Sequence, residues 1–472
     1  MIEEKYIAAA DLGTSRISLG VAKIKGDDIQ VVYYRETPSD GISKSVVENP
    51  MKASIPLKKA IEDAEHELLI KISQMAVGLP RYSVIQEVAE GGMDRNDPEE
   101  YITREEVENL KSIAVETYPI DDTKNQIMFG AVAQSFSTDD QMNFREEDVI
   151  GTISDTLKGN FKVFIGRRKA TTAVDKIFNG LGIAPAKQYF LPEMTAKAVL
   201  SEEEMENGVA LVDLGAGVTS VTIYQGGIMR HYEAIPFGGW NITNDIKMEC
   251  SISEHLAENI KLAYGACMPN KLANLSEKII QIRNDYSPNK EVPVKYISEI
   301  IDARIREILD AVLFSIQESG LQKELRSGMV LTGGGAKLAN IKMLAKEMSG
   351  YTVRIGIPRQ NRITASGCPG VFEPSAASLA GMLMAAKDDN LPDCAQEVEK
   401  SAPAEEDAPD EPMTMDEVNN GQTGTLIQEE EFGPAVPKEK KQAKKREKKA
   451  MSWIKFTNVM DHLYNTITDD KL

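Results

Sequence analysis

The sequence of 472 residues has few cysteines and no long apolar run. Its four cysteines contain no C-x-x-C pair, which argues against a disulfide framework or a zinc site and favours a reducing compartment. No apolar stretch reaches the length of a membrane-spanning helix. The N-terminus is charged and runs directly into a predicted strand, so we expect no signal peptide.

Positively charged residues are fewer than negatively charged ones in this sequence. The 54 Lys and Arg residues are outnumbered by 73 Asp and Glu residues, which gives a net charge of -19. This balance argues against nucleic acid as a partner. The hydrophobic fraction of 42% is ordinary for a globular protein, and the length suffices for two cores and a tail.

Residues 1 to about 386 alternate between strand-like and helix-like stretches, which predicts an α/β fold. The stretch 6–10 is typical of a buried strand, and 17–25 of its hairpin partner. A helix is predicted over 55–71. Residues 206–224 then repeat the opening pattern of strand, Asp, glycine turn and strand. This internal repeat predicts two lobes built on one plan.

Residues 80 to about 170 differ from both lobes because Gly and Pro interrupt them. A helix is predicted over 103–116, since Thr103 followed by Glu106 forms a capping box. Strands are predicted near 126–135 and 162–166. We therefore expect an inserted α+β unit here.

The composition changes again at residue 387. Residues 388–431 are rich in Asp, Glu, Pro and Ser, which predicts a disordered linker. A basic run follows at 438–449, and 451–467 carries apolar residues at helical spacing. The residues expected on the apolar face are Trp453, Ile454, Phe456, Met460, Leu463, Tyr464 and Ile467. Such a helix would bind anionic membrane lipid, or else dock on the chain's own body or in a partner's groove.

Two motifs place an aspartate at the end of a buried strand, just before a glycine turn. The first is Asp11-Leu12-Gly13-Thr14-Ser15, and the second is Asp213-Leu214-Gly215-Ala216-Gly217-Val218-Thr219. The glycines let backbone N–H groups approach phosphate oxygens, and Thr14, Ser15 and Thr219 add hydroxyl donors. Asp11 and Asp213, facing each other, would hold hydrated Mg²⁺. Each motif alone is also compatible with an ordinary hairpin turn that has a capping aspartate.

A third motif is Gly333-Gly334-Gly335, which joins a predicted strand to a predicted helix. Such a backbone can lie flat against a nucleoside and its α-phosphate. The alternative is a glycine-rich turn with a packing role. The G-x-G-x-x-G spacing of a Rossmann fingerprint is absent.

These three motifs, in this order, resemble the phosphate-1, phosphate-2 and adenosine motifs of the actin-like ATPase superfamily. Segments 235–246, 257–265 and 372–381 resemble the FtsA family of bacterial cell-division proteins more closely. The resemblance implies two facing ribonuclease-H-like lobes with ATP and Mg²⁺ between them. It implies nucleotide contacts for Asp11, Gly13, Thr14, Ser15, Asp213, Gly215, Gly217, Thr219, Gly238, Glu258, Lys261, Gly333, Gly334 and Gly335. Asp11 and Asp213 would reach Mg²⁺ through water.

Without the resemblance, Glu258 and Lys261 would be an ordinary solvated helix pair. The sequence also departs from the family's pattern at Val218, Trp240 and Asn340. Glu193 follows Pro192 where related ATPases carry a glutamate, and it is the candidate for positioning the attacking water. Alternatively, it is a helix-start glutamate that interacts with the helix dipole.

We expect six segments: lobe 1 over 1–80 and 171–205, the inserted subdomain over 81–170, lobe 2 over 206–386, the linker over 387–450, and the membrane-targeting helix over 451–468. The resemblance implies a polymer at the cytoplasmic face of the inner membrane that tethers the C-terminal tail of FtsZ at the division site. The tail would bind the half of the folded body nearer the C-terminus, other division proteins would be possible partners, and any ATP hydrolysis would be slow.

Two other functions share the nucleotide motifs. A sugar or acetate kinase would need a substrate cleft with a catalytic aspartate, for which the sequence offers no clear candidate. A chaperone of the heat-shock type would need a β-rich peptide-binding domain after the ATPase, and the residues after Lys387 are too polar and too few for one.

Overall fold

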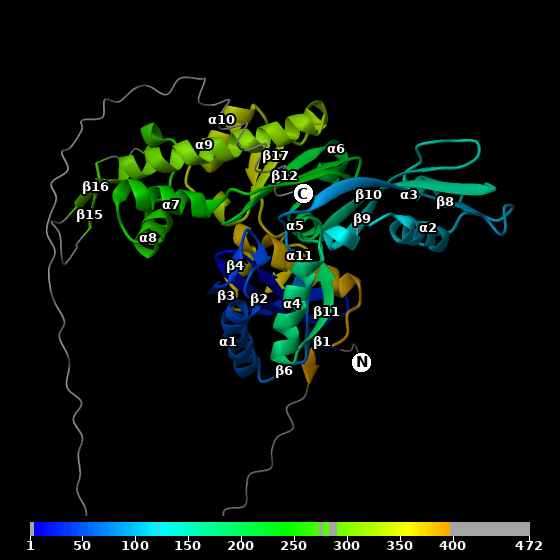
Figure 1. Cartoon of the computed structure of the whole chain (residues 1–472), viewed down its shortest axis with the longest axis horizontal. Coiled ribbons are helices and arrows are strands. Elements are labelled where there is room, and N and C mark those ends of the chain that lie inside the picture. The colour runs from blue at the N-terminus through cyan, green and yellow to red at the C-terminus, as the bar shows by residue number, and fades with distance from the viewer. Residues whose placement is uncertain (1–3, 121, 273–276, 283–289, 397–472) are drawn as a thin grey trace, which may run out of the picture. The chain divides into compact units, whose positions relative to one another are not determined.

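The computed structural model describes residues 4–120, 122–272, 277–282 and 290–396 (Figure 1). The linker from residue 397 onward, the basic run and the C-terminal apolar helix lie outside the described residues. Those three expectations therefore stay predictions from the sequence.

The first lobe is built on a mixed sheet that begins with the predicted hairpin. The sheet order is β11 (Ala184–Tyr189), β7 (Gln74–Gly78), β1 (Glu4–Leu12), β2 (Arg16–Lys25), β3 (Asp28–Pro38) and β19 (Thr364–Ala365). The predicted helix is α1 (Pro50–Leu68), which begins before residue 55 because Asn49 caps it. The Asn49 side chain accepts a hydrogen bond from the Lys52 N–H at 3.1 Å, and Pro50 occupies the first helical position.

Both faces of the first sheet are buried, since alternate residues of β1 enter different cores. Ala8 and Ala10 pack with α1 and α4 (Arg168–Leu181). Ile7 and Ala9 pack with α5 (Leu191–Val199) and α11 (Ala377–Asp388).

The second lobe repeats this arrangement. Its sheet has the order β14 (Ile228–Ile235), β13 (Thr219–Gln225), β12 (Val209–Leu214), β17 (Met329–Thr332) and β18 (Val353–Ile355). Ala210 and Val212 pack with α7 (Gly239–Cys250), α8 (Glu254–Tyr264), α9 (Val294–Glu318) and α10 (Ile341–Ser349). Val209 and Leu211 face the other way and join the core that contains α5 and α11. These two helices therefore lie between the sheets and give the lobes a shared core (Figure 1).

The predicted internal repeat is confirmed by strand pairing. In each lobe an antiparallel hairpin, β1–β2 or β12–β13, is followed by a third antiparallel strand, β3 or β14. The first strand of each hairpin also pairs in parallel with a later strand, β7 or β17. The chain thus builds the same four-strand unit twice.

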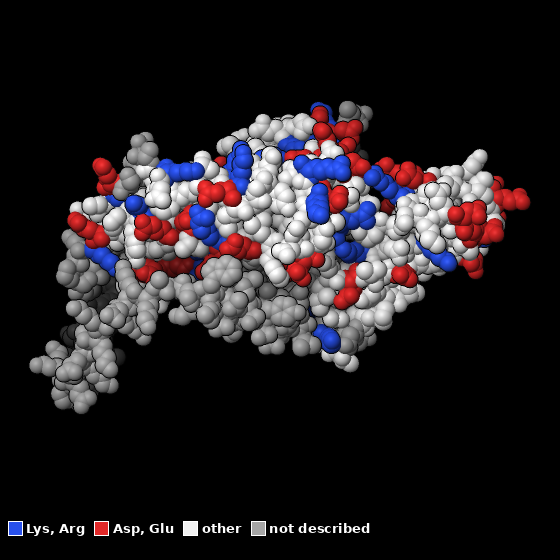
Figure 2. All heavy atoms as spheres, turned by 90° about the horizontal axis from the view of Figure 1, so that it is seen from above, with Lys and Arg blue, Asp and Glu red and all other residues white. Residues whose placement is uncertain are grey.

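The insertion forms an antiparallel sheet with the order β8 (Ile85–Asp94), β10 (Thr156–Arg167) and β9 (Gln126–Ser137). Helix α2 (Arg104–Thr117) packs on it, and the predicted capping box between Thr103 and Glu106 is present. The rings of Phe136 and Phe161 meet edge to face at 5.9 Å in its core. Acidic side chains are prominent at this end of the face seen in Figure 2.

Short elements complete the described chain. They are β4 (Ile42–Ser43), β5 (Val46–Val47), β6 (Lys71–Ile72), α3 (Glu146–Val149), α6 (Glu202–Asn207), β15 (Ile279–Ile282), β16 (Lys290–Pro293), β20 (Ala395–Gln396) and the 3₁₀ turns η1 (Asp122–Lys124), η2 (Pro269–Lys271), η3 (Gln322–Glu324), η4 (Gly334–Lys337), η5 (Pro369–Phe372) and η6 (Pro374–Ala376).

The C-terminal boundaries differ from those expected. Strand β19 belongs to the first sheet, although residues 206–386 were assigned to lobe 2. The folded body also extends past residue 387, because β20 pairs with β6 and the Cys394 N–H donates to the Tyr6 carbonyl oxygen at 2.9 Å. Strands of two residues carry no readable periodicity, so the sequence gives no signal for them.

We predict that Gly381→Ala will destabilise the protein, because a Cβ at this position on α11 would overlap the Met194 carbonyl oxygen on α5. Overpacking of this kind typically costs about 1–3 kcal/mol. The matched control is Gly180→Ala on α4, where a Cβ would meet nothing within 4 Å. It should be neutral or stabilising by up to about 1 kcal/mol. Denaturant unfolding measures both, and equal stabilities for the two variants would contradict the predicted helix contact.

Candidate functional site

The two aspartates occupy equivalent places in the two hairpins. Asp11 pairs with Ser18 across β1–β2, and Asp213 pairs with Ser220 across β12–β13. In both hairpins four residues separate the last paired positions, Leu12 and Ile17 or Leu214 and Thr219. The same loop therefore presents the same carboxylate from each lobe.

Both loops require glycine at their first position. A Cβ on Gly13 would lie 2.6 Å from the Arg16 carbonyl oxygen, and one on Gly215 would lie 2.6 Å from the Val218 carbonyl oxygen. Each distance is far below van der Waals contact, so a larger residue would force the turn open. Val218, a departure from the family's pattern, is buried, and its carbonyl oxygen accepts from the Gly215 N–H at 3.0 Å.

The loops from the two lobes meet each other. A Cβ on Gly217 would lie 2.8 Å from Thr14 Oγ1 and 3.2 Å from Lys44 Cα. Thr14 Oγ1 itself accepts a hydrogen bond from the Ser45 N–H at 2.8 Å. Ser15 is exposed beside these residues. The predicted phosphate loops are thus adjacent, as the hypothesis of one shared site requires.

Arg81 lies between the two aspartates. Its Nη2 is 3.1 Å from Asp11 Oδ2, and its Nε is 3.5 Å from Asp213 Oδ2. All three side chains are largely buried, at 12% exposure each. The two carboxylates therefore share one cation, which is a guanidinium contributed by the chain itself.

The side chains of Ser378 and Tyr232 contact Arg81, Thr195 supports Ser378, and sequence reasoning identified none of the three. Arg81 Nη2 donates to Ser378 Oγ at the start of α11, and Ser378 Oγ lies 3.1 Å from Thr195 Oγ1 on α5. The Tyr232 hydroxyl of β14 donates to the Arg81 carbonyl oxygen at 2.5 Å. The available signal was the position of Arg81 just after β7, because β7 runs parallel to β1 and ends at the same edge of the sheet.

Burial and charge act in opposite directions on this cluster. Burial by itself lowers the pKa of Arg81, but the charges of Asp11 and Asp213 raise it, and the net shift is upward. Burial raises the pKa of Asp213, the charge of Arg81 opposes this, and Asp11 adds to the increase. Arg81 is therefore held firmly in its charged form.

The glycine triplet adjoins the second aspartate. Gly333 has φ +80°, and a Cβ there would overlap Asp213 Oδ1. Gly334 is exposed, with nothing within 4 Å of a built Cβ, and Gly335 packs against Leu214. The expected helix does not follow at once: η4 comes first, and α10 begins after Asn340, whose φ of 65° suits Asn.

Glu258 and Lys261 of α8 reach the start of α7, beside the second loop. Lys261 Nζ lies 2.7 Å from Glu258 Oε2 and donates to the Gly239 carbonyl oxygen at 3.0 Å. The Gly239 N–H in turn donates to the Gly215 carbonyl oxygen at 2.9 Å. Burial lowers the pKa of Lys261, and Glu258 opposes that shift. The pair is thus tied to the loop and is not an ordinary solvated pair.

Gly238 and Trp240, at the start of α7, both lie against the loop of the second hairpin. Gly238 precedes α7, and a Cβ there would lie 2.5 Å from the Gly215 carbonyl oxygen. Trp240 is 46% exposed, and its backbone N–H donates to the Ala216 carbonyl oxygen at 2.7 Å. The start of α7 therefore packs tightly against the loop, while the Trp240 ring lies outside.

Thr219 does not present its hydroxyl to the site. It is fully buried at the start of β13, and its Oγ1 donates to the Phe237 carbonyl oxygen at 2.8 Å. The hydroxyl proton is therefore engaged inside the second lobe. Thr219 stabilises the fold there and does not offer the hydroxyl donor to phosphate that was expected.

Within the described residues, no hydrogen bond or ion pair joins Glu193 to Asp11 or Asp213, whose ion-pair partner is Arg81. Burial raises the pKa of Glu193, and the charges of Lys111 on α2 and Lys197 on α5 oppose this increase. The role of Glu193 in positioning water therefore stays a prediction from the sequence.

The expected Mg²⁺ does not fit between the carboxylates as they stand. A magnesium ion keeps a shell of water at about 2.0–2.1 Å and accepts only oxygen ligands. Here a guanidinium contacts Asp11 and Asp213 and fills the space that they share. No metal step can be assigned to this arrangement.

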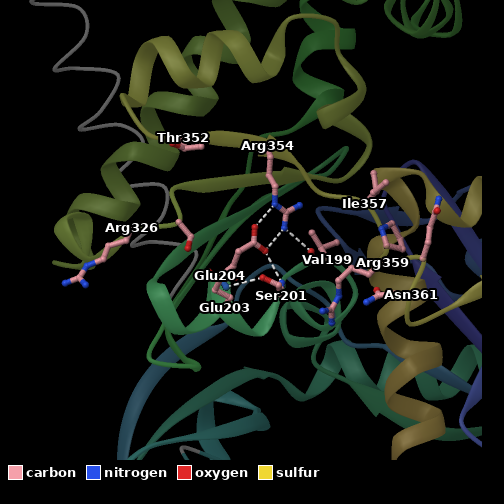
Figure 3. A pocket seen from close by; sticks show the side chains of 13 residues that line it. Val199, Ser201, Glu203, Glu204, Arg326, Thr352, Arg354, Ile357, Arg359 and Asn361 are labelled. Atoms are coloured by element: carbon pink, nitrogen blue, oxygen red, sulfur yellow. Dashed lines mark hydrogen bonds and ion pairs between the residues drawn. The ribbon is translucent and has the colours of Figure 1, made fainter.

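A separate hollow of about 820 Å³ lies beside α6 and β18 (Figure 3). Arg354 points across it and binds Glu204 through two N–O contacts of 2.6 Å. Arg359 also lines the hollow, and its Nη2 donates to the Lys197 carbonyl oxygen at 3.2 Å. None of the residues that line the hollow belongs to the three glycine motifs. It is therefore distinct from the candidate nucleotide site.

Solved structures of related shape define the class. The protein of a structure described as the PilM-PilN type IV pilus biogenesis complex superposes with a TM-score of 0.58 at 15% identity, covering 81% of this chain and 98% of its own. A structure of MreB 5 of Spiroplasma citri bound to AMPPNP gives a TM-score of 0.50 at 13% identity, covering 82% and 97%. Two lobes with duplicated hairpins and these neighbours define an actin-like fold, as expected.

Sequence comparison then gives the family. The model described as "Cell division protein FtsA" matches residues 210–381. A protein of that name from Neisseria meningitidis serogroup B is 30% identical over 361 residues, which cover 76% of this chain and 85% of the relative. The one from Escherichia coli strain K12 is 24% identical over 364 residues, covering 75% and 85%. The chain belongs to the FtsA family of cell-division proteins.

Within the described residues, none of the helices combines the length and the apolar character that a membrane span requires. Within the same residues, the inserted unit, the two lobes and the glycine loops are all present. The family and the fold therefore agree with the resemblance drawn from the motifs.

We predict that Glu193→Gln will stabilise the fold at neutral pH. Burial raises the folded-state pKa of Glu193 above its ordinary value of 4.5, although Lys111 and Lys197 oppose this. Between the two pKa values the folded state binds more protons than the unfolded state, so wild-type stability falls as the pH rises through them. Gln does not titrate, so the variant avoids this loss.

The free energy of unfolding of Glu193→Gln minus that of the wild type should therefore grow as the pH rises above the ordinary Glu pKa of 4.5. Urea unfolding at several pH values measures it. Glu108→Gln, at an exposed position of α2, is the control and should show no such trend. If the difference in unfolding free energy between Glu193→Gln and the wild type stayed constant with pH, burial would not be raising the pKa of Glu193.

Proposed function

We propose that this chain binds ATP at the meeting point of its two lobes and acts in cell division as a membrane-attached polymer that tethers FtsZ. The observation that carries the proposal is the convergence of three motifs. Thr14 and Gly217 adjoin each other, Asp213 adjoins Gly333, and Asp11 and Asp213 share Arg81. A nucleotide between the loops would touch both lobes.

The chain's own groups suit phosphate binding. Within the described residues, Arg81 Nε is a buried donor that has no hydrogen-bond partner. An arginine N–H favours phosphate oxygens, and the loop glycines leave their backbone open to close approach. The exposed Gly334 offers a flat surface toward the nucleoside. ATP supplies the phosphates on which these groups act.

We propose that hydrolysis is slow. The carboxylates at the site, Asp11 and Asp213, both pair with Arg81, which makes them poor acceptors for a proton from water. ATP would therefore act mainly as a ligand that favours one arrangement of the lobes.

We propose that the C-terminal helix expected over 451–468 binds anionic lipid at the cytoplasmic face of the inner membrane. One amphipathic helix binds marginally, whereas several in a polymer bind together through effective concentration. Self-assembly would thus strengthen attachment. The FtsZ tail would bind the half of the body that contains α7, α8 and α9, on the analogy of the family, and other division proteins would join there or elsewhere.

We predict that Gly217→Val will weaken ATP binding by at least about tenfold, because the added side chain fills the contact between the two loops. Titration calorimetry measures the dissociation constant. Gly180→Ala, on the surface of α4, is the control and should bind like the wild type. Unchanged affinity in Gly217→Val would move the nucleotide away from these loops.

We predict that Phe456→Glu will release the protein from liposomes that contain phosphatidylglycerol, because it puts a charge on the expected apolar face. Asn458→Glu adds the same charge on the expected polar face and should keep most of the binding. Sedimentation with and without ATP measures both, and ATP should increase wild-type pelleting. Deletion of residues 451–472 should abolish binding, and undiminished pelleting of the deletion would refute the anchor.

A further inference from the structure

We propose that Arg81 is the resident cation of the nucleotide site and that it replaces a divalent metal in nucleotide binding. The proposal rests on the proposed ATP function and specifies its chemistry. The guanidinium already contacts one carboxylate from each lobe, Asp11 at 3.1 Å and Asp213 at 3.5 Å. These are the two groups that would otherwise hold a hydrated metal.

The charge of the cluster supports this assignment. Two buried carboxylates without a cation would be strongly unfavourable, and the usual remedy is a metal or a paired base. Arg81 meets this need with a group that does not lose its proton in proteins. Its planar fork also lets separate nitrogens serve separate partners, as Nη2 and Nε do here.

Arg81 is fixed in place by contacts on both its backbone and its side chain. Tyr232 binds its carbonyl oxygen at 2.5 Å, and the Arg81 N–H donates to Ser45 Oγ at 3.4 Å. Ser378 binds Nη2 from α11. These contacts come from three separate segments of the chain, so the guanidinium is built into the site.

The turn beside Arg81 adds a second observation. Lys44 and Ser45 are consecutive non-glycine residues with positive φ, at 45° and 62°. Such backbone is strained and persists where the surrounding structure requires it. This turn donates from the Ser45 N–H to Thr14 of the first loop, and Ser45 Oγ accepts from the Arg81 backbone N–H. It therefore ties the first loop to the backbone of Arg81.

Arg81 also retains capacity for a ligand. Its Nε has no hydrogen-bond partner within the described part of the chain, although the Asp213 carboxylate lies nearby. A phosphate oxygen can accept from this N–H and gain the charge-assisted contact that a metal would otherwise provide. Nucleotide binding should therefore need little or no divalent cation.

The test compares ATP binding in Mg²⁺ and in excess EDTA for the wild type, Arg81→Ala, Arg81→Lys and the control Arg35→Ala. Arg35 is an exposed arginine of β3 that pairs with Asp63. The wild type and Arg35→Ala should change affinity by less than about threefold between the two conditions. Arg81→Ala should lose at least about tenfold in EDTA and regain affinity with Mg²⁺. Arg81→Lys keeps a charge and should stay closer to the wild type.

Mn²⁺ alone, followed by electron paramagnetic resonance, gives a readout that needs no nucleotide. The wild type should not bind it at this site, whereas Arg81→Ala should, because its two carboxylates are released. Wild-type ATP binding that falls at least about tenfold in EDTA would overturn the role of Arg81 and leave the ATP function standing. A wild type that binds no ATP in either condition would overturn both. The wild-type comparison stands even if Arg81→Ala does not fold.

Discussion

The guanidinium of Arg81, held between Asp11 and Asp213, is the interaction on which the two-lobe arrangement depends. Each aspartate lies one residue before the end of the first strand of its lobe's hairpin. The first lobe pairs Asp11 with Arg81, and Asp213 of the second lobe depends on that same cation. Buried charges are expensive unless they are paired, and loss of one partner typically costs about 3–5 kcal/mol. The helices α5 and α11 add the apolar counterpart, because both sheets share the core in which they lie. The Arg81 ion pairs and the shared apolar core around α5 and α11 therefore both connect the two lobes.

The duplicated hairpin places one aspartate at the same position in each lobe, so a single cation can contact both. The hairpins have equal loops, and each begins with a glycine that the same carbonyl contact requires. The lobes differ in the segment that comes after the parallel neighbouring strand: β7 leads to Arg81, whereas β17 leads to the glycine triplet. One lobe therefore supplies the positive charge, and the other supplies open backbone. This asymmetry turns two similar halves into one site.

The sequence predicted what is encoded locally. The two Asp and Gly hairpins and the Thr103 capping box depend on neighbouring residues, and all of them are present. Arg81 was missed because its role arises only when β7 pairs with β1 in parallel. The two-residue strands β19 and β20 were missed because their partners are more than three hundred residues away along the chain. Glu193 and Thr219 were assigned by pattern, but their surroundings are set by tertiary packing.

A nucleotide bound as proposed would change the interaction that joins the lobes. A phosphate oxygen that accepts from Arg81 Nε would compete with the nearby Asp213 carboxylate, so binding would weaken one contact between the lobes while adding new contacts to both. A ligand shifts a conformational equilibrium only by its difference in affinity for the two states. In this chain that difference would arise at Arg81, because the proposed phosphate contact and the contact between the lobes use the same guanidinium. The Thr14–Gly217 contact then fixes how closely the loops can approach with a ligand between them. Nucleotide occupancy would thereby set the lobe arrangement that the proposed polymer would recognise.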